Sequence, residues 1–181
     1  MYIDGKLLTG GEKTRLHADP YGVRIYDAEK CLPGYTLFSP AWGNQAYLID
    51  MRGLVVHTWQ ITHSNVAEIL PSGNLFTQNC GSWLEELTPD SKTVWRWEGD
   101  EDLLAPNHHD FWVGDDEIVS LAAIHEPVVP GIYQPGTEPD HMRTDLILKI
   151  NRQKQVLWRF SFSDHVESLC ALAGYPMPIP Y

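Results

Sequence analysis

Three segments of the sequence repeat one pattern, and this repeat limits the possible folds more than any other feature. The pattern occurs in residues 47–59 (YLIDMRGLVVHTW), 85–97 (EELTPDSKTVWRW) and 147–160 (ILKINRQKQVLWRF), which align without gaps on Asp50, Thr88 and Asn151. Asp, Asn and Thr open turns by hydrogen-bonding to nearby backbone, and the alternating apolar and aromatic residues that follow are typical of a strand. Each segment is therefore predicted to form a β-hairpin that packs on a neighbouring sheet.

A second repeated unit precedes the last two of these hairpins. It contains Pro-Ser-Gly-Asn within residues 65–78 and Gly-Asp-Asp within residues 108–123, and both sequences favour a turn between two strands. The plan is two hairpins, or about four strands, at a period of about 40 residues, which is typical of a β-propeller blade. We therefore expect an all-β protein built as a β-propeller.

The repeat also divides the chain into parts. Residues 1–33 form a predicted N-terminal extension, residues 34–163 the propeller blades, and residues 164–181 a short helix and a C-terminal tail. The helix is expected over residues 164–174, where a glycine closes it. A Pro- and Gly-rich insertion at 125–144 stretches the last blade, and a long stretch of this kind is more often a functional loop than a linker.

About two and a half blades fit in this chain, whereas a propeller closes with at least about four. An unclosed fan of sheets exposes apolar faces and unpaired strand edges. Either the chain folds as an open sandwich, or a second polypeptide or a homo-oligomer completes the propeller. We favour completion by another chain, so that the protein does not work as a monomer.

Alternation along the predicted strands gives a candidate core. Side chains at every second position share one face of a strand, and the apolar ones are expected inside. The predicted core consists of Leu48, Ile49, Val55, Val56, Trp59, Leu70, Leu75, Leu87, Val94, Trp97, Ile118, Leu121, Ile147, Leu157 and Phe160.

The charge of the chain excludes several classes of partner. The formal net charge is -11, so nucleic acid and an anionic membrane surface are not expected to bind. The three cysteines are far apart and lack the CxxC spacing of a zinc knuckle or the even number of a disulfide framework. No signal peptide and no run of 18 apolar residues is visible, so we expect a cytoplasmic protein with no membrane span.

The most unusual motif is Asn-His-His-Asp-Phe at residues 107–111. It is predicted to open an inner strand, where alternation would place His108 and Asp110 on one face and His109 on the other unless the strand is bulged. His108 or His109 could act as a nucleophile, a proton-transfer group or a metal ligand that Asp110 orients. The alternative is a structural role, in which a histidine satisfies backbone groups between blades and Asp110 caps a turn.

Other polar residues join this candidate site with weaker support. Asn65 aligns with His108 one blade earlier, and His63 lies two residues before it, so both are candidate substrate-binding residues or parts of a solvated loop. His125 and His141 flank the insertion and are candidate ligands of a divalent metal ion, although no HxH or HExxH spacing supports them. His57 replaces a tryptophan of the repeat and is expected to pack, as are Trp59, Trp95, Trp97 and Trp158.

Four motifs in order, GYTLFSPAWGNQAYLIDMRGLVVHTW, EILPSGNL, ELTPDSKTVWRW and HHDFWVGDDEIVSLA, resemble the arylsulfotransferase-like propeller family. The resemblance covers about residues 34–160 and implies a six-bladed propeller with its active site in a central funnel. In the arylsulfotransferases a histidine carries a sulfuryl group from a phenolic sulfate ester to a phenol, and related propellers alkylate aromatic rings. The HHDF motif matches a funnel strand of that family, whereas its other funnel histidines, with an Asn and an Arg, lie in later blades that this sequence does not reach.

The resemblance therefore implies part of an arylsulfotransferase-like transferase with a histidine-lined funnel and a small aromatic or sulfated substrate. Two alternatives stay open, because one fold hosts many chemistries. The first is a metal-dependent hydrolase or lyase on the same propeller, and the second is a binding or scaffold propeller without chemistry. No GxSxG elbow, P-loop or GxGxxG motif is present, and no cysteine has the setting of a nucleophile.

Overall fold

The computed structural model describes residue 23 and residues 25–64, 66–129, 133, 136 and 139–174. It also describes the backbone of three short strands near the N-terminus, β1 (Tyr2–Ile3), β2 (Lys6–Leu7) and β3 (Lys13–Arg15). Strand β1 pairs with β2, and β3 pairs with β4 (Ile25–Asp27), so the N-terminal extension contributes two small antiparallel ribbons.

The rest of the chain forms three antiparallel sheets in which sequence neighbours pair. The first sheet contains β5 (Thr36–Phe38), β6 (Gly43–Ile49) and β7 (Val55–Ser64). The second contains β8 (Ala67–Ile69), β9 (Leu75–Asn79), β10 (Trp83–Leu87) and β11 (Thr93–Trp97). The third contains β12 (Phe111–Val113), β13 (Glu117–Glu126), β14 (Met142–Asn151) and β15 (Val156–Ser161).

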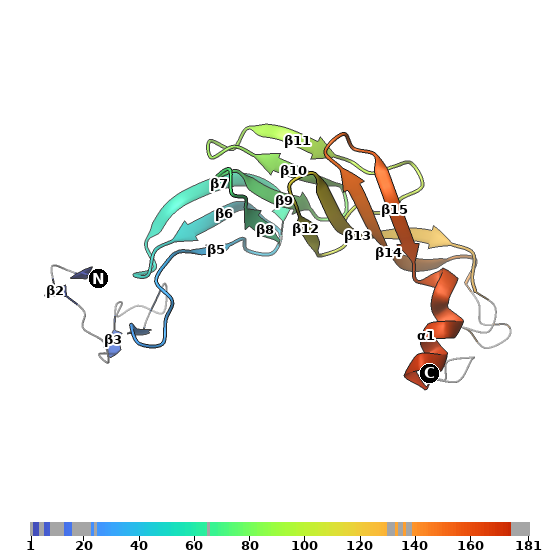
Figure 1. Ribbon diagram of the computed structural model, residues 1–181, viewed down its shortest axis with the longest axis horizontal. Coiled ribbons are helices and arrows are strands. Elements are labelled where there is room, and N and C mark those ends of the chain that lie inside the picture. The colour runs from blue at the N-terminus through green and yellow to red at the C-terminus, as the bar shows by residue number, and fades with distance from the viewer. Residues whose placement is uncertain are drawn as a thin grey trace.

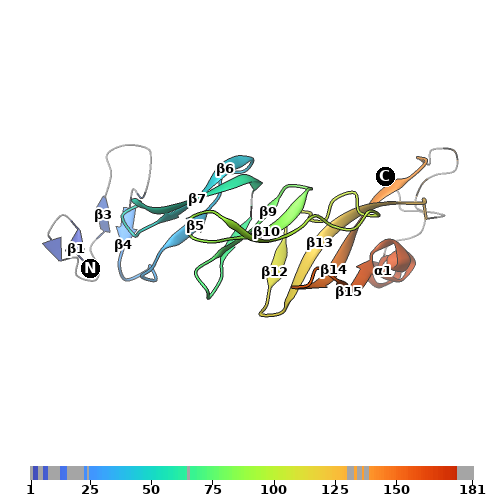
Figure 2. The same cartoon turned by 90° about the horizontal axis from the view of Figure 1, so that it is seen from above.

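The prediction of an all-β chain made of hairpins is confirmed by these sheets. Figure 1 shows them following one another along an arch in chain order, and Figure 2 shows the same succession from above. No sheet closes on itself within the described residues. The insertion is shorter than predicted, because β13 runs to Glu126 and β14 begins at Met142, so the connection spans residues 127–141.

The helix predicted at the C-terminal end is also present. A single 3₁₀ turn (η1, Ser163–His165) leads into α1 (Val166–Ala173). Gly174 ends the helix in the left-handed conformation at φ 74°, as expected for a residue without a Cβ. None of the helices within the described residues has the length and apolar character needed to cross a membrane.

Neighbouring strands run in opposite directions, so each sheet has connections between strands at two opposite ends. The two ends differ in the kind of connection they carry. The tight turns, such as those that follow Asp50, Thr88 and Asn151, lie at one end, which we call the hairpin end. The connections from β5 to β6, β7 to β8, β9 to β10, β11 to β12 and β13 to β14 lie at the other, which we call the connection end. His63, His108, His109, His125 and His141, the candidate histidines, all belong to the connection end.

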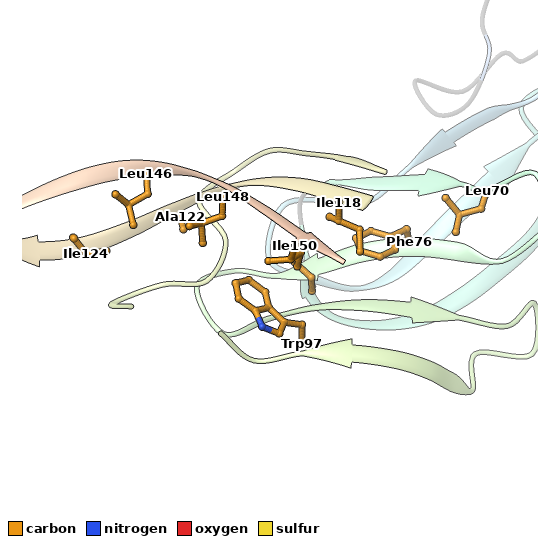
Figure 3. Packing of buried hydrophobic residues seen from close by; sticks show 10 residues of the cluster. Leu70, Phe76, Trp97, Ile118, Ala122, Ile124, Leu146, Leu148 and Ile150 are labelled. Carbon is orange, nitrogen blue, oxygen red and sulfur yellow. The ribbon is translucent and has the colours of Figure 1, made fainter. Parts of the chain in front are cut away.

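Two apolar clusters fill the spaces between the sheets. Between the first two sheets lie Ala46, Trp59, Ile61, Leu75 and Leu87. The larger cluster, drawn in Figure 3, joins Leu70, Phe76, Leu84 and Trp97 of the second sheet to Ile118, Ala122, Ile124, Leu146, Leu148 and Ile150 of the third. Six of the predicted core residues are buried, namely Trp59, Leu70, Leu75, Leu87, Trp97 and Ile118, whereas Leu48, Ile49, Leu121, Ile147 and Phe160 are half-buried.

Four predicted core residues are exposed, and three of them share one cause. The ladder shifts register at the same place in each repeat, so that Val56, Val94 and Leu157 have no cross-strand partner. Such a β-bulge breaks the period-2 alternation from which the core was predicted. Their exposures are 47%, 55% and 50%. The fourth, Val55, pairs with Ile49 at the start of β7 and is 55% exposed.

Neighbouring sheets are also joined by two hydrogen bonds, which are formed at equivalent positions of the repeat. His57 Nε2 lies 2.8 Å from the carbonyl oxygen of Pro89 in the second sheet. In the equivalent position, Trp95 Nε1 donates to the carbonyl oxygen of Arg152 in the third sheet at 2.9 Å. The packing role predicted for His57 is thus confirmed, because its ring also contacts Trp59 edge-on, with 4.2 Å between the ring centroids.

Candidate functional site

The segment before β12 continues the edge of the third sheet in an irregular conformation. Ala105 and Ala123 exchange both backbone hydrogen bonds, at 3.0 and 2.9 Å. Further along, the His108 N–H donates to the Leu121 carbonyl at 2.7 Å, and the Leu121 N–H donates to the Asp110 carbonyl at 3.2 Å. Both His108 and Asp110 thus pair with one residue of β13, so the motif is bulged and the regular strand begins only at Phe111.

This bulge brings both histidines to one cavity. His109 has a φ of 73°, a left-handed conformation that is uncommon for a residue with a side chain. As a result, the two rings lie with their centroids 4.5 Å apart, and both line the same space. The alternation that would have put them on opposite faces does not hold, because it applies only to a regular strand.

His108 is oriented by a carboxylate that the sequence did not single out. Its Nδ1 lies 2.7 Å from Asp145 Oδ1, and Asp145 belongs to β14, on the far side of β13. An ionised carboxylate only accepts hydrogen bonds, so Nδ1 carries the proton in this pair and a neutral ring leaves its Nε2 lone pair free to react. The predicted orienting residue, Asp110, instead accepts a hydrogen bond from the Phe111 N–H at 2.9 Å, which is the turn-capping alternative.

Asn107 anchors the motif to the second sheet. Its side chain is buried, and its Nδ2 donates to the carbonyl oxygens of Asn79 and Trp83, at 2.8 and 2.9 Å. Its Oδ1 accepts from the Gly81 N–H at 3.2 Å. One amide therefore satisfies the backbone of the turn between β9 and β10, and it fixes where the adjacent histidines stand relative to that turn.

The cavity next to the histidines has a volume of about 270 Å³. Its walls come from all three sheets and are formed by Trp42, Gln78, Cys80, Gly81, Ala105, Asn107, His108, His109 and Arg143. Trp42, in the connection between β5 and β6, is 68% exposed and offers a free aromatic surface. Burial raises the pKa of the Cys80 thiol, so this cysteine is a neutral wall residue rather than a nucleophile.

His63, His125 and His141 lie at the same end of the sheets but outside the cavity wall. His63 is exposed and has a φ of 43°, and its carbonyl accepts from the Cys80 N–H at 3.2 Å. Asn65 lies outside the described residues. His125 pairs with Arg143 across the β13–β14 ladder, and His141 precedes β14, both with exposed side chains.

A metal site does not form from these groups alone. Among the described residues, no three or more His, Cys, Asp and Glu side chains gather closely enough to hold a metal ion. The carboxylate beside His125, that of Glu126, accepts hydrogen bonds from Ser161 and Ser163 instead. Metal binding by His125 and His141 therefore stays a prediction.

Asp145, Arg143 and Trp42 have roles in the candidate site that the sequence analysis did not predict. Asp145 and Arg143 stand two residues apart on β14 and so share a face of that strand. Their charged side chains precede the apolar run Leu-Ile-Leu in the strand sequence MRTDLILKI, and this pair of charges was the available signal. Trp42 lies two residues after Pro40 in a turn and has a φ of 63°. Nothing in the neighbouring sequence predicts this conformation.

Comparison with protein-family models finds none that matches this chain. A search of curated proteins likewise finds no relative.

Proposed function

We propose that the cavity is part of the active site of an aryl sulfate sulfotransferase in which His108 is the nucleophile. The observation that carries this proposal is the 2.7 Å contact between His108 Nδ1 and Asp145, in a cavity that the ring lines. The contact leaves Nε2 as the reactive nitrogen, which is the arrangement that a histidine nucleophile needs. The resemblance of the HHDF motif to a funnel strand of the arylsulfotransferase-like family supports the same reaction.

The other walls suit an aromatic sulfate ester. Trp42 presents an indole on which a phenyl ring can stack. Arg143 contributes a guanidinium to the cavity wall, and its planar donors match the oxygens of an anionic ester. The cavity therefore has a positive group although the formal net charge of the chain is -11. An aryl sulfate would thus lie with its ring on Trp42 and its sulfate between Arg143 and the histidines.

In the first step, His108 Nε2 attacks sulfur, the S–O bond to the aryl group breaks, and a phenolate leaves. In the second step, the oxygen of an acceptor phenol attacks sulfur, the S–N bond breaks, and its electron pair returns to Nε2. The acceptor phenol loses one proton and the departing phenolate gains one, and His109, whose ring is 4.5 Å from that of His108, is placed to carry it. Asp145 keeps the ring in one tautomer and stabilises its positive charge while the sulfuryl group is attached.

The three sheets are, in this proposal, part of a propeller of six blades that another chain completes. The exposed side chains of Leu157 and Trp158 on the third sheet support this, as does the family resemblance. The further funnel residues that the family uses would then come from outside the described sheets.

The test is a reaction of the protein with 4-nitrophenyl sulfate. We expect release of 4-nitrophenolate and the mass of one sulfuryl group on the peptide that contains His108. His108→Gln should lose the label, and Arg143→Gln should weaken binding of 4-nitrophenyl sulfate but not of 4-nitrophenol, which has no sulfate. His165→Ala is the matched control, because this histidine stacks on Phe160 away from the cavity. Labelling that persists in His108→Gln, or equal binding of the sulfate and the phenol, would contradict the proposal.

A further inference from the structure

Gln78 is a buried amide in the cavity wall that the proposed reaction does not use. It lies in β9 and is 1% exposed, and it lines the same cavity as His108 and His109. An amide is costly to bury for the sake of packing alone. The repeat does not require one here, because the alignment of Asn65 with His108 places Leu121 at the equivalent position of the third sheet. A polar role in the cavity therefore explains this residue better than packing does.

The side chain of Gln78 faces the third sheet. Strand β9 pairs with β10 without a register shift, so Phe76 and Gln78 lie on one face of β9. Phe76 belongs to the apolar cluster between the second and third sheets (Figure 3), and its ring lies 5.0 Å from that of Phe111 in β12, measured between the centroids. Strand β9 runs toward the connection end and β12 runs away from it. Gln78 therefore lies on the connection-end side of this ring pair, as His109 does.

Gln78 and His108 reach the cavity from different sheets. His108 belongs to the segment that continues the edge of the third sheet, where Asp145 of β14 orients it, whereas Gln78 comes from the second sheet. In an in-line displacement, as in phosphoryl transfer, the attacking atom and the leaving atom lie on opposite sides of the reacting centre. When His108 Nε2 attacks sulfur from the third sheet, the aryl oxygen therefore leaves toward the second sheet, to which Gln78 belongs.

We propose that Gln78 is a catalytic residue whose Nε2–H donates a hydrogen bond to the aryl oxygen of the sulfate ester. Negative charge collects on this oxygen as the S–O bond breaks and the phenolate leaves. A fixed donor that faces developing charge in a site with little water stabilises the transition state. In the second step the oxygen of the acceptor phenol takes the same position, and its proton passes to His109. The hydrogen of the Gln78 amide is not transferred in either step.

This inference rests on the proposed transfer of a sulfuryl group through His108, and it adds the group that stabilises the leaving oxygen. Arg143 is the residue proposed to hold the sulfate oxygens in the bound ester. Loss of the Gln78 amide should therefore slow the breaking of the S–O bond and leave the binding of the ester nearly unchanged.

The kinetic test uses Gln78→Met, which keeps the length of the side chain and removes its N–H donors. At saturating phenyl sulfate, we expect the rate of His108 sulfation to fall about 10²-fold. The fall with 4-nitrophenyl sulfate should be smaller, because 4-nitrophenolate is a less basic leaving group. Thr77→Val is the matched control: Thr77 is 0% exposed in the same strand, but its hydroxyl contacts Ser64 and the Val66 carbonyl. This variant should keep the ratio of the two rates.

A second test measures binding alone and does not depend on sulfuryl transfer. The probe is 4-nitrophenolate, whose absorption moves to longer wavelength when a hydrogen bond to its phenolate oxygen is lost. We expect the absorption maximum of bound 4-nitrophenolate to lie at longer wavelength in Gln78→Met than in the unsubstituted protein, and the dissociation constant to rise about tenfold. In the unsubstituted protein, 4-nitrophenolate should shift the side-chain NH₂ resonances of Gln78, a result that needs no variant.

The outcomes separate this inference from the reaction on which it rests. If His108 is labelled, but Gln78→Met changes neither the ratio of rates nor the absorption of bound 4-nitrophenolate, Gln78 is not the donor and the sulfuryl transfer stands. If no label reaches His108 while Gln78→Met moves the absorption, the contact with the phenolate oxygen stands and the proposed reaction fails. Equal effects of Gln78→Met and Thr77→Val would assign them to the packing of β9 and overturn the inference.

Discussion

His108 and Asp145 meet with 2.7 Å between Nδ1 and Oδ1, although the strand β13 separates their backbones. Ala123, the residue of β13 that pairs with Asp145, is fully buried, and the His108 N–H donates to the carbonyl of Leu121 two residues earlier on the same strand. The pair therefore depends on the register of three strands.

The first prediction concerns the tautomer of His108. In the unsubstituted protein we expect the neutral ring to carry its proton on Nδ1, visible in the nitrogen chemical shifts of the imidazole. Asp145→Asn replaces a pure acceptor by an amide that also donates, so the preference should weaken and both tautomers should appear. The rate of His108 sulfation by 4-nitrophenyl sulfate should fall at least about a hundredfold.

Asp110→Asn serves as the control for that variant. Its carboxylate accepts only from the Phe111 N–H, an interaction that an asparagine oxygen can replace. Its His108 should keep the Nδ1–H tautomer. If Asp110→Asn changed the tautomer and Asp145→Asn did not, the assignment of the orienting carboxylate would be reversed.

The second prediction concerns Asn107. Asn107→Ala removes three hydrogen bonds and leaves the carbonyls of Asn79 and Trp83 without this donor inside the protein. Because buried polar groups that lose their partner are costly, we expect a loss of about 2–3 kcal/mol in the free energy of unfolding, measured by urea denaturation. Asn74→Ala is the control: its side chain is half-buried and donates to Glu86 alone, so its loss should stay below about 1 kcal/mol. Equal losses would show that Asn107 is no anchor.

The third prediction concerns the repeated bulge. Val94→Ser changes an exposed residue that has no cross-strand partner, so the free energy of unfolding should change by no more than about 0.5 kcal/mol. Leu84→Ala in the same sheet empties a fully buried site and should cost about 2–5 kcal/mol. Thermal or urea unfolding of the two variants compares them directly. A large loss in Val94→Ser would mean that the bulged residue packs in a way its exposure does not show.

The bulge explains why the sequence predicted the hairpins better than the core. A turn depends on a few neighbouring residues, and Asp50, Thr88 and Asn151 each predict one hairpin turn. The bulge at Val56, Val94 and Leu157 inserts one residue into an apolar strand without any turn-forming residue, and the apolar composition hides it. Leu121, Ile147 and Phe160 were expected inside and are half-buried for another reason: burial depends on a neighbouring sheet, which a strand pattern does not report.

The candidate site shows the same limit. The adjacent histidines stood out because two titratable side chains at the start of an apolar strand are unusual, and both do line a cavity. The sequence did not predict the contact of Asp145 with His108, because the two residues are 37 positions apart and meet only through the pairing of β13 with β14. Asp110, the carboxylate nearest to His108 in the sequence, instead accepts a hydrogen bond from the backbone N–H of Phe111. Proximity in sequence was a poor guide where the chain is bulged.

The last prediction uses the hairpin turn at Asp50. Burial opposes ionisation of this carboxyl, but hydrogen bonds from the Leu54 N–H, the Arg52 N–H and the Arg52 guanidinium together lower its pKa below the usual 3.8. A carboxyl with a lowered pKa in the folded state contributes stability that is fully present above its unfolded pKa. That contribution is lost as the pH falls through the folded pKa.

Asp50→Asn isolates this charge, because the equivalent turn of the third sheet already uses Asn151, whose Oδ1 accepts from the Gln155 N–H at 2.8 Å. We expect Asp50→Asn to cost about 0.5–1 kcal/mol at neutral pH and nothing once the pH is below the folded pKa of Asp50. The reverse change, Asn151→Asp, should add a dependence of the same sign to the third sheet. Urea denaturation at a fixed protein concentration from about pH 7 to pH 2 measures both variants against the unsubstituted protein. If the deficit of Asp50→Asn grew as the pH fell, the carboxylate would not be the form that the turn stabilises.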